Sequence, residues 1–99
     1  MDSFEWRGVR LERKVGPLLQ ADIGGVSIYL FPPGDGNQYE AIIYGCRRGS
    51  ALHVDPVAAL DDALREVMRL EKLYRDKAVS EIVELERRFA ILDGLARNP

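Results

Sequence analysis

Residues 56–93 of the chain read PVAALDDALREVMRLEKLYRDKAVSEIVELERRFAILD, and neither glycine nor proline follows Pro56 in this stretch. Apolar side chains recur along it at the three- and four-residue spacing of one helix face. The pattern predicts a helical part over residues 56–94. The members of the apolar stripe are Leu60, Leu64, Val67, Tyr74, Ala78, Ile82, Leu85, Phe89 and Leu92.

Asp55 and Pro56 predict where the helical part begins. An aspartate before the first turn accepts the free backbone amides there, and a proline at the first helical position gives up no hydrogen bond. Gly94 is a natural C-terminal cap. Ion pairs at i,i+4 support a helix between these signals. The expected pairs are Asp61–Arg65, Glu71–Arg75 and Glu84–Arg88.

The number of helices in this part is open. One unbroken helix would be roughly 57 Å long at about 1.5 Å per residue, whereas a six-residue strand covers only about 20 Å. Ser80 offers a cap for a second helix. We therefore expect a long C-terminal helix that is continuous or gently bent, or one that is kinked or split near 77–80 into an antiparallel pair.

Residues 1–55 predict an antiparallel β-meander of four or five strands. Apolar and polar residues alternate in short runs, which is typical of strands with one covered face. Gly24-Gly25 lies between two such runs and predicts a hairpin turn, and residues 32–37 form a dense turn cluster. One or two strands are expected before Gly16-Pro17, near residues 6–15, and further strands near residues 19–23, 26–31, 39–46 and 51–54. The fold class is therefore α+β, with residues 1–99 forming one domain made of a sheet (1–55) and a helical part (56–94).

Two of these strands are apolar on both faces. Val26, Ile28 and Leu30 alternate with Ser27, Tyr29 and Phe31, and the next strand adds Ile42 and Tyr44 to the second face. Aromatic residues on an open face can form stabilising cross-strand pairs. Alternatively, a partner protein, a second copy or the far half of the helical part covers this face. We expect a partner-binding site there, made of Tyr29, Phe31, Ile42 and Tyr44.

The far end of the apolar helix stripe also needs cover. Leaving a leucine- or phenylalanine-sized side chain in water forgoes about 1.5–3 kcal/mol. We expect the sheet to be too small to cover the whole stripe, so either the helix folds back or a second chain binds. We expect a homodimer through Ile82, Leu85, Phe89 and Leu92.

Charge and composition narrow the class of protein. The net charge is −2, and neither half of the chain is strongly basic or acidic. Nucleic-acid binding usually needs a positive face, so it is disfavoured. The longest apolar run is far below the roughly 20 residues of a membrane span, and no secretory signal pattern is visible at the start of the chain. A cytoplasmic location is expected, with no membrane partner.

No catalytic, metal or cofactor site is expected. Cys46 is the only cysteine and His53 the only histidine, and nothing in their spacing groups them with further ligands. Asp61, Asp62 and Glu66 lie on one helix turn, where acidic side chains complement the positive end of the helix dipole. We therefore do not expect an enzyme.

The order of these signals resembles a class of small phage and prophage proteins that have an antiparallel meander followed by a helix. The resemblance covers roughly residues 4–73, and the helix past Leu73 departs from it. It implies a protein that inhibits or adapts a host protein by binding it, such as an anti-defence or anti-CRISPR protein. The matching residues are Trp6, Ala21-Asp22-Ile23-Gly24-Gly25, Tyr39-Glu40-Ala41-Ile42-Ile43 and Ala58-Ala59-Leu60-Asp61-Asp62-Ala63-Leu64.

The sequence thus favours a non-enzymatic protein–protein interaction module that forms a homodimer and binds a protein partner of unknown identity. The alternative is a nucleic-acid-binding protein in which the aromatic side chains of the sheet stack on bases beside Arg47 and Arg48.

Overall fold

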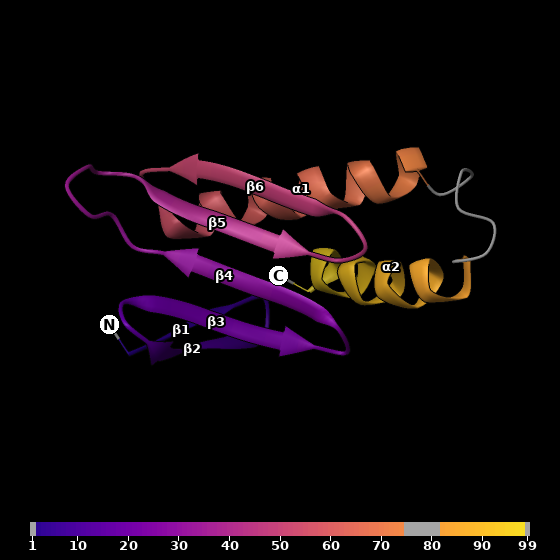
Figure 1. The fold of residues 1–99 in the computed structure, drawn as a ribbon, viewed down its shortest axis with the longest axis horizontal. Coiled ribbons are helices and arrows are strands. Elements are labelled where there is room, and N and C mark those ends of the chain that lie inside the picture. Colours follow the sequence, from indigo (N-terminus) through magenta and orange to yellow (C-terminus); the bar gives the residue numbers. More distant parts are fainter. Residues whose placement is uncertain (1, 75–81, 99) are drawn as a thin grey trace.

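A computed structural model describes residues 2–74 and 82–98 of the chain. The strands form one antiparallel sheet in which neighbours along the chain are also neighbours in space, and two helices follow (Figure 1). The elements are β1 (Ser3–Trp6), β2 (Val9–Val15), β3 (Leu18–Ile23), β4 (Val26–Phe31), β5 (Tyr39–Tyr44), β6 (Arg48–His53), α1 (Pro56–Tyr74) and α2 (Ile82–Arg97). The predicted α+β class is confirmed.

The sheet has six strands, so the expected count of four or five is wrong. The first two strands are separated by a two-residue turn at Arg7-Gly8, where φ is 49° and 79°. This turn places Trp6 opposite Val9 and makes a hairpin. Residues other than glycine seldom adopt positive φ, so Arg7 is a weak turn signal in a sequence.

The predicted Gly24-Gly25 hairpin is confirmed. Both glycines have positive φ, 56° and 90°, as a primed turn requires, and Ile23 pairs with Val26 across the turn. The last strand begins at Arg48 rather than at residue 51, because the turn after β5 occupies only residues 45–47.

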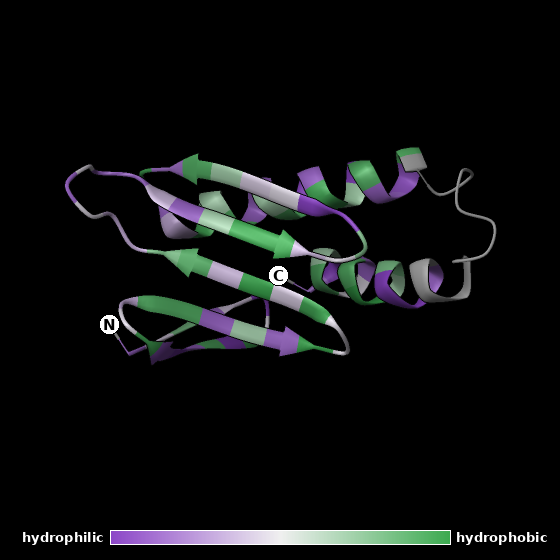
Figure 2. Ribbon diagram, viewed as in Figure 1, coloured by the Kyte–Doolittle hydropathy of each residue, from purple (hydrophilic) through white to green (hydrophobic). Residues whose placement is uncertain are grey.

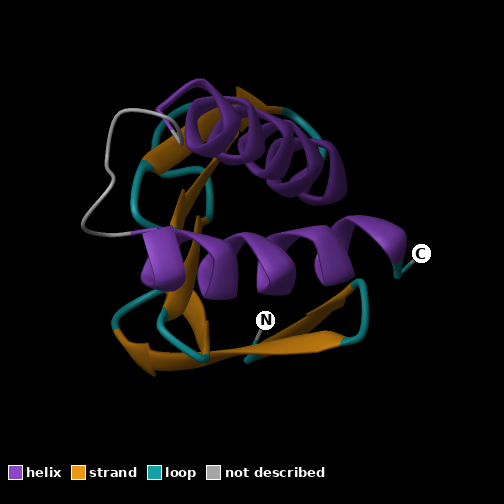
Figure 3. Cartoon of the chain, turned by 90° about the vertical axis from the view of Figure 1, so that its right-hand side faces the viewer, coloured by secondary structure: helices purple, strands orange, loops and turns teal. Residues whose placement is uncertain are grey.

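Both helices pack on one side of the sheet, and the sheet curls around them (Figure 3). Strands β3–β6 form a plate at the front of Figure 1, while β1 and β2 fold back behind it. A register shift between Arg13 and Val15 interrupts the β2–β3 pairing where this curl begins. We call the helix side of the sheet the inner face and the opposite side the outer face.

The core lies between the inner face and the helices. Hydrophobic residues alternate with polar ones along the strands (Figure 2), and the inner set is buried. The buried hydrophobic residues of the plate are Leu19, Val26, Ile28, Leu30, Ala41 and Ile43, and those of α1 are Ala59, Leu60, Ala63, Leu64 and Val67.

Within residues 56–74 and 82–98 the chain forms two helices, α1 and α2, that lie side by side, so a single extended helix over residues 56–94 is wrong. Helix α1 begins as predicted, with the backbone amide of Ala58 donating to Asp55 Oδ2 at 3.1 Å. Helix α2 runs back beside α1 along the sheet (Figure 1). The return brings Leu92 and Leu95 into the core, where their burial favours the split arrangement over an extended rod.

Helix α2 does not end at Gly94 but continues to Arg97. Its end is held by the β1–β2 turn: Arg7 Nη1 donates to the carbonyl oxygens of Leu95 at 3.2 Å and Ala96 at 2.8 Å. A cationic group at this end satisfies the last carbonyl groups and complements the helix dipole. A cap from a distant part of the chain thus replaces the expected glycine cap.

Candidate protein-binding face

The outer face of the β3–β6 plate carries the four residues predicted to bind a partner. The strand register sets Tyr29 opposite Ile42, and Ser27 opposite Tyr44. Phe31 lies two residues after Tyr29 on β4, so both side chains project from the same face. The structure therefore brings the four predicted residues together on one surface.

These side chains line a shallow hollow of about 410 Å³. We call it the aromatic hollow. The rings of Tyr29 and Tyr44 meet edge to face, with centroids 5.9 Å apart and 86° between their planes, which is a favoured aromatic geometry. Phe31 is 37% and Tyr44 is 39% exposed. The hollow is lined by Leu18, Ser27, Tyr29, Phe31, Ile42 and Tyr44.

Neither described helix covers the aromatic hollow. Over residues 2–74 and 82–98, both helices lie on the inner face (Figure 3). The idea that the far half of the helical part covers the aromatic face is therefore wrong for these residues. The alternatives left are cover by a partner protein, cover by a second copy, and an open face.

Charged side chains lie around the aromatic hollow. Asp22 precedes the Gly24-Gly25 turn, and its carboxylate accepts hydrogen bonds from the Ser27 hydroxyl at 2.9 Å and the Gly25 amide at 3.3 Å. On β6, at the opposite edge of the plate from Asp22, Arg48 pairs in register with Tyr44. Glu40 of β5 pairs with Phe31 of β4. The outer face is thus apolar in the middle with both signs of charge at its edges.

The residues predicted to form a dimer contact on α2 do not form one exposed stripe. Leu92 is fully buried within its own chain, so its assignment to a dimer contact is corrected. Phe89 is half-buried, with Lys72 Nζ 5.8 Å from its ring centroid. The side chains of Ile82 and Leu85 lie outside the described part of the chain.

A buried carboxylate, for which the sequence predicts only an ion pair with Arg75, lies between α1 and the turn after β5. Glu71 is 2% exposed, and its Oε1 accepts the backbone amide of Arg47 at 2.6 Å. A Cβ at Gly45 would lie 2.9 Å from the same oxygen, so the glycine leaves room for this contact. The helical spacing from Leu64 and Val67 leads to position 71, which is the signal that could have placed Glu71 inside.

A second polar cluster joins the first hairpin to α1. Asp61 Oδ1 accepts hydrogen bonds from Trp6 Nε1 at 2.9 Å and Arg7 Nε at 3.0 Å. Burial alone would raise the pKa of Asp61, but these hydrogen bonds and the charges of Arg7 and Arg65 lower it below its ordinary value. The sequence predicts only the helix dipole and Arg65 as the electrostatic partners of Asp61, because no local pattern links it to Trp6.

Cys46 and His53 lie at opposite ends of β6. Cys46 is in the turn before it, where Arg88 Nη1 lies 3.7 Å from Sγ. His53 Nδ1 accepts the amide of Asp55 at 3.0 Å. Within residues 2–74 and 82–98, no three His, Cys, Asp or Glu side chains are grouped so as to hold a metal ion. Likewise, the helices of the described ranges are too short or too polar to cross a membrane.

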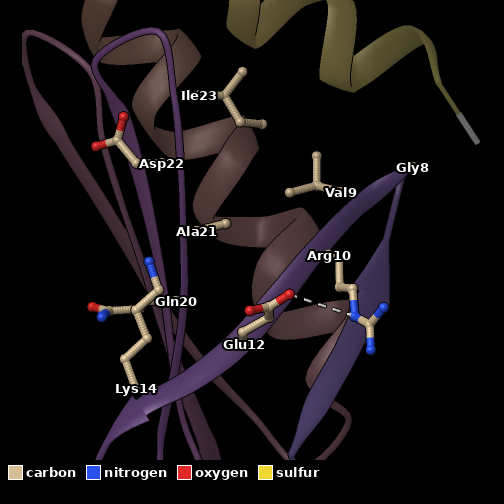
Figure 4. A pocket seen from close by; sticks show the side chains of 9 residues that line it. All are labelled: Gly8, Val9, Arg10, Glu12, Lys14, Gln20, Ala21, Asp22 and Ile23. Atoms are coloured by element: carbon tan, nitrogen blue, oxygen red, sulfur yellow. Dashed lines mark ion pairs between the residues drawn. The ribbon is translucent and has the colours of Figure 1, made fainter.

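Another hollow, of about 400 Å³, lies where β2 and β3 separate (Figure 4). The pairing of these strands stops at Glu12 and Gln20. Arg10 and Glu12 form an ion pair at 3.7 Å across the hollow's wall, and both side chains are more than half exposed. Lys14 and Asp22 add one charge of each sign. Such mixed, hydrated charges indicate ordinary polar surface rather than a built site.

Comparison of the chain with protein-family models, with curated proteins and with solved structures found no match. The resemblance to small phage proteins therefore stays a prediction.

Proposed function

We propose that the protein is a non-enzymatic protein–protein interaction module that binds a protein through the aromatic hollow. The observation that carries this proposal is an aromatic surface on a sheet face that both described helices leave uncovered. Contiguous apolar surface of this kind often marks an interaction site. Tyrosine is enriched at such sites, because its ring offers apolar area and its hydroxyl remains able to bond.

The charges around the aromatic hollow favour a protein over a nucleic acid. Arg48 lies beside Tyr44, as the stacking alternative needs. However, Asp22 and Glu40 lie on the same plate and would repel phosphates. Arg47, the second cation of that alternative, is half-buried, and its backbone amide bonds to Glu71 on the inner side of the sheet.

The resemblance to phage proteins extends the proposal to the kind of partner. An inhibitor or adaptor acts by occupying the surface of a host protein and needs no chemistry of its own. An uncovered, preformed apolar hollow suits this role, because a rigid surface loses little conformational entropy on binding.

Site-specific photo-crosslinking in the source cells tests this proposal. A benzophenone amino acid at position 44 should cross-link to protein, and the product should disappear when Ile42→Asp disrupts the aromatic hollow. The same amino acid at Leu73, an exposed residue of α1, is the matched control and should give no such product. Products that contain only nucleic acid, or none at position 44, would overturn the proposal.

A further inference from the structure

We propose that the outer face of β3–β6 binds the same face of a second copy, about a two-fold axis that runs parallel to the strands between β4 and β5. This inference rests on the proposed function, because it names a partner for the same face. The axis places β4 of one copy on β5 of the other, and β3 on β6. A two-fold interface must be self-complementary, so the order of side chains across the four strands is the evidence.

The charged residues of the plate fit this axis. The register places Asp22, Ser27, Tyr44 and Arg48 in one row across the four strands. Three strand spacings, roughly 14 Å in total, separate the two charged ends of the row. Neither Asp22 nor Arg48 forms an ion pair with another residue of 2–74 or 82–98. The axis sets Asp22 opposite Arg48 of the second copy, and symmetry makes this contact twice.

The apolar residues fit the same axis. Tyr29 of one copy faces Ile42 of the other, which puts apolar surface on apolar surface at the centre. At the level of the 32–38 loop, Leu18 faces Leu52 of the second copy. Leu52 is 59% exposed in the single chain, so the pairing would remove a large leucine side chain from water.

A two-fold axis perpendicular to the strands fits poorly. An axis perpendicular to the strands exchanges the two ends of each strand, so Asp22 would face Leu18 and Arg48 would face Leu52 of the second copy. Neither charge gains an ionic partner in that arrangement, whereas the parallel axis pairs both. The charge pattern therefore favours the parallel axis over the perpendicular one, and aligned sheet packing accommodates the twist of both plates.

The size of the plate sets the expected strength. Four strands about 4.8 Å apart and about 20 Å long give a contact well below the roughly 800 Å² per partner of a standard interface. Across the proposed interface, Glu40 of one copy faces Phe31 of the other. This contact lies at the end of the plate beside the 32–38 loop, where the Glu40 carboxylate stays hydrated. We therefore expect a weak, reversible dimer rather than an obligate one.

Sedimentation equilibrium of the full chain from micromolar to millimolar concentration tests the pairing. The wild type should shift from a mass of 11.2 kDa towards twice that value. Asp22→Arg or Arg48→Asp alone sets like charges opposite each other at two places and should raise Kd by about a hundredfold. An equal mixture of the two variants restores both ion pairs in the heterodimer and should recover the wild-type Kd. Asp62→Arg, a charge change on α1, is the matched control and should leave Kd unchanged.

Three results would overturn the pairing, and they separate it from the proposed function. A wild-type mass that stays at 11.2 kDa at every concentration excludes the second copy, while a cross-link from position 44 to another protein would keep the function. This axis is excluded if neither single charge change raises the Kd of the dimer, or if the equal mixture of the two variants does not recover the wild-type Kd. A dimer that survives Tyr29→Asp, together with no cross-link at position 44, excludes both the pairing and the function.

Discussion

Asp61 shows how one side chain can join three parts of a fold. Its carboxylate on α1 accepts the Trp6 indole N–H of β1 and the Arg7 guanidinium of the first turn. The same guanidinium holds the end of α2. Hydrogen bonds to a charged group contribute more than neutral ones, so Asp61 stabilises the arrangement of the hairpin and both helices.

Asp61→Asn should lower the free energy of unfolding by about 1–3 kcal/mol at pH 7, because the charge that attracts Trp6 and Arg7 is lost. The pKa of Asp61 is lowered in the folded chain. Its contribution is therefore fully present above the ordinary pKa and is lost as the pH falls through the lowered pKa. The difference between wild type and variant should shrink below about pH 4.

Urea unfolding across a pH series measures this difference. Asp62→Asn is the matched control, since the neighbouring carboxylate is in an exposed ion pair with Arg65, and such pairs contribute little. Equal pH profiles for the two variants would contradict the role of Asp61.

At the scale of elements, the approach of α1 to β6 depends on Gly49. A Cβ at this position would lie 2.4 Å from the Ala63 carbonyl oxygen and 2.4 Å from the Val67 amide nitrogen. Both are backbone atoms of α1, so only a displacement of the helix relieves the clash. Gly49→Ala should therefore lower the free energy of unfolding by about 1–3 kcal/mol or more.

Gly34→Ala is the control for this change, because nothing lies within 4 Å of a Cβ there. Chemical denaturation compares the two variants, and the near-ultraviolet circular dichroism of Trp6 reports any helix displacement. Equal stability of the two variants would show that α1 does not approach β6 this closely.

Elements marked by local chemistry could be predicted from the sequence. The Gly24-Gly25 turn and the Asp55 cap depend on residues that touch their own neighbours, and both are confirmed. The first hairpin and the end of α2 could not be predicted, because they depend on each other through Arg7. The aromatic face could be predicted from the alternating pattern on two strands. That Asp22 and Arg48 lie at the two ends of one row across the sheet could be known only from the strand register.

At the scale of the whole molecule, the sequence left open whether α2 binds its own chain or another. The apolar stripe indicates that burial is required, but periodicity carries no information on which surface provides it. The return of α2 places Leu92 against the inner core, and the outer face of the sheet becomes the apolar surface available to a partner. Stability and association should therefore depend on different residues.

Leu92→Ala tests this separation. Truncating a fully buried leucine should lower the free energy of unfolding by about 2–5 kcal/mol, because the lost contacts leave a cavity in the core. The loss should be the same at low and high protein concentration, since the side chain packs within its own chain. Leu73→Ala, which truncates a leucine that is 56% exposed on α1, is the control and should change stability little. Thermal unfolding followed over a dilution series measures both variants. If the effect of Leu92→Ala instead fades on dilution, where a dimer would dissociate, then Leu92 packs against a second copy and the returning helix is not what buries it.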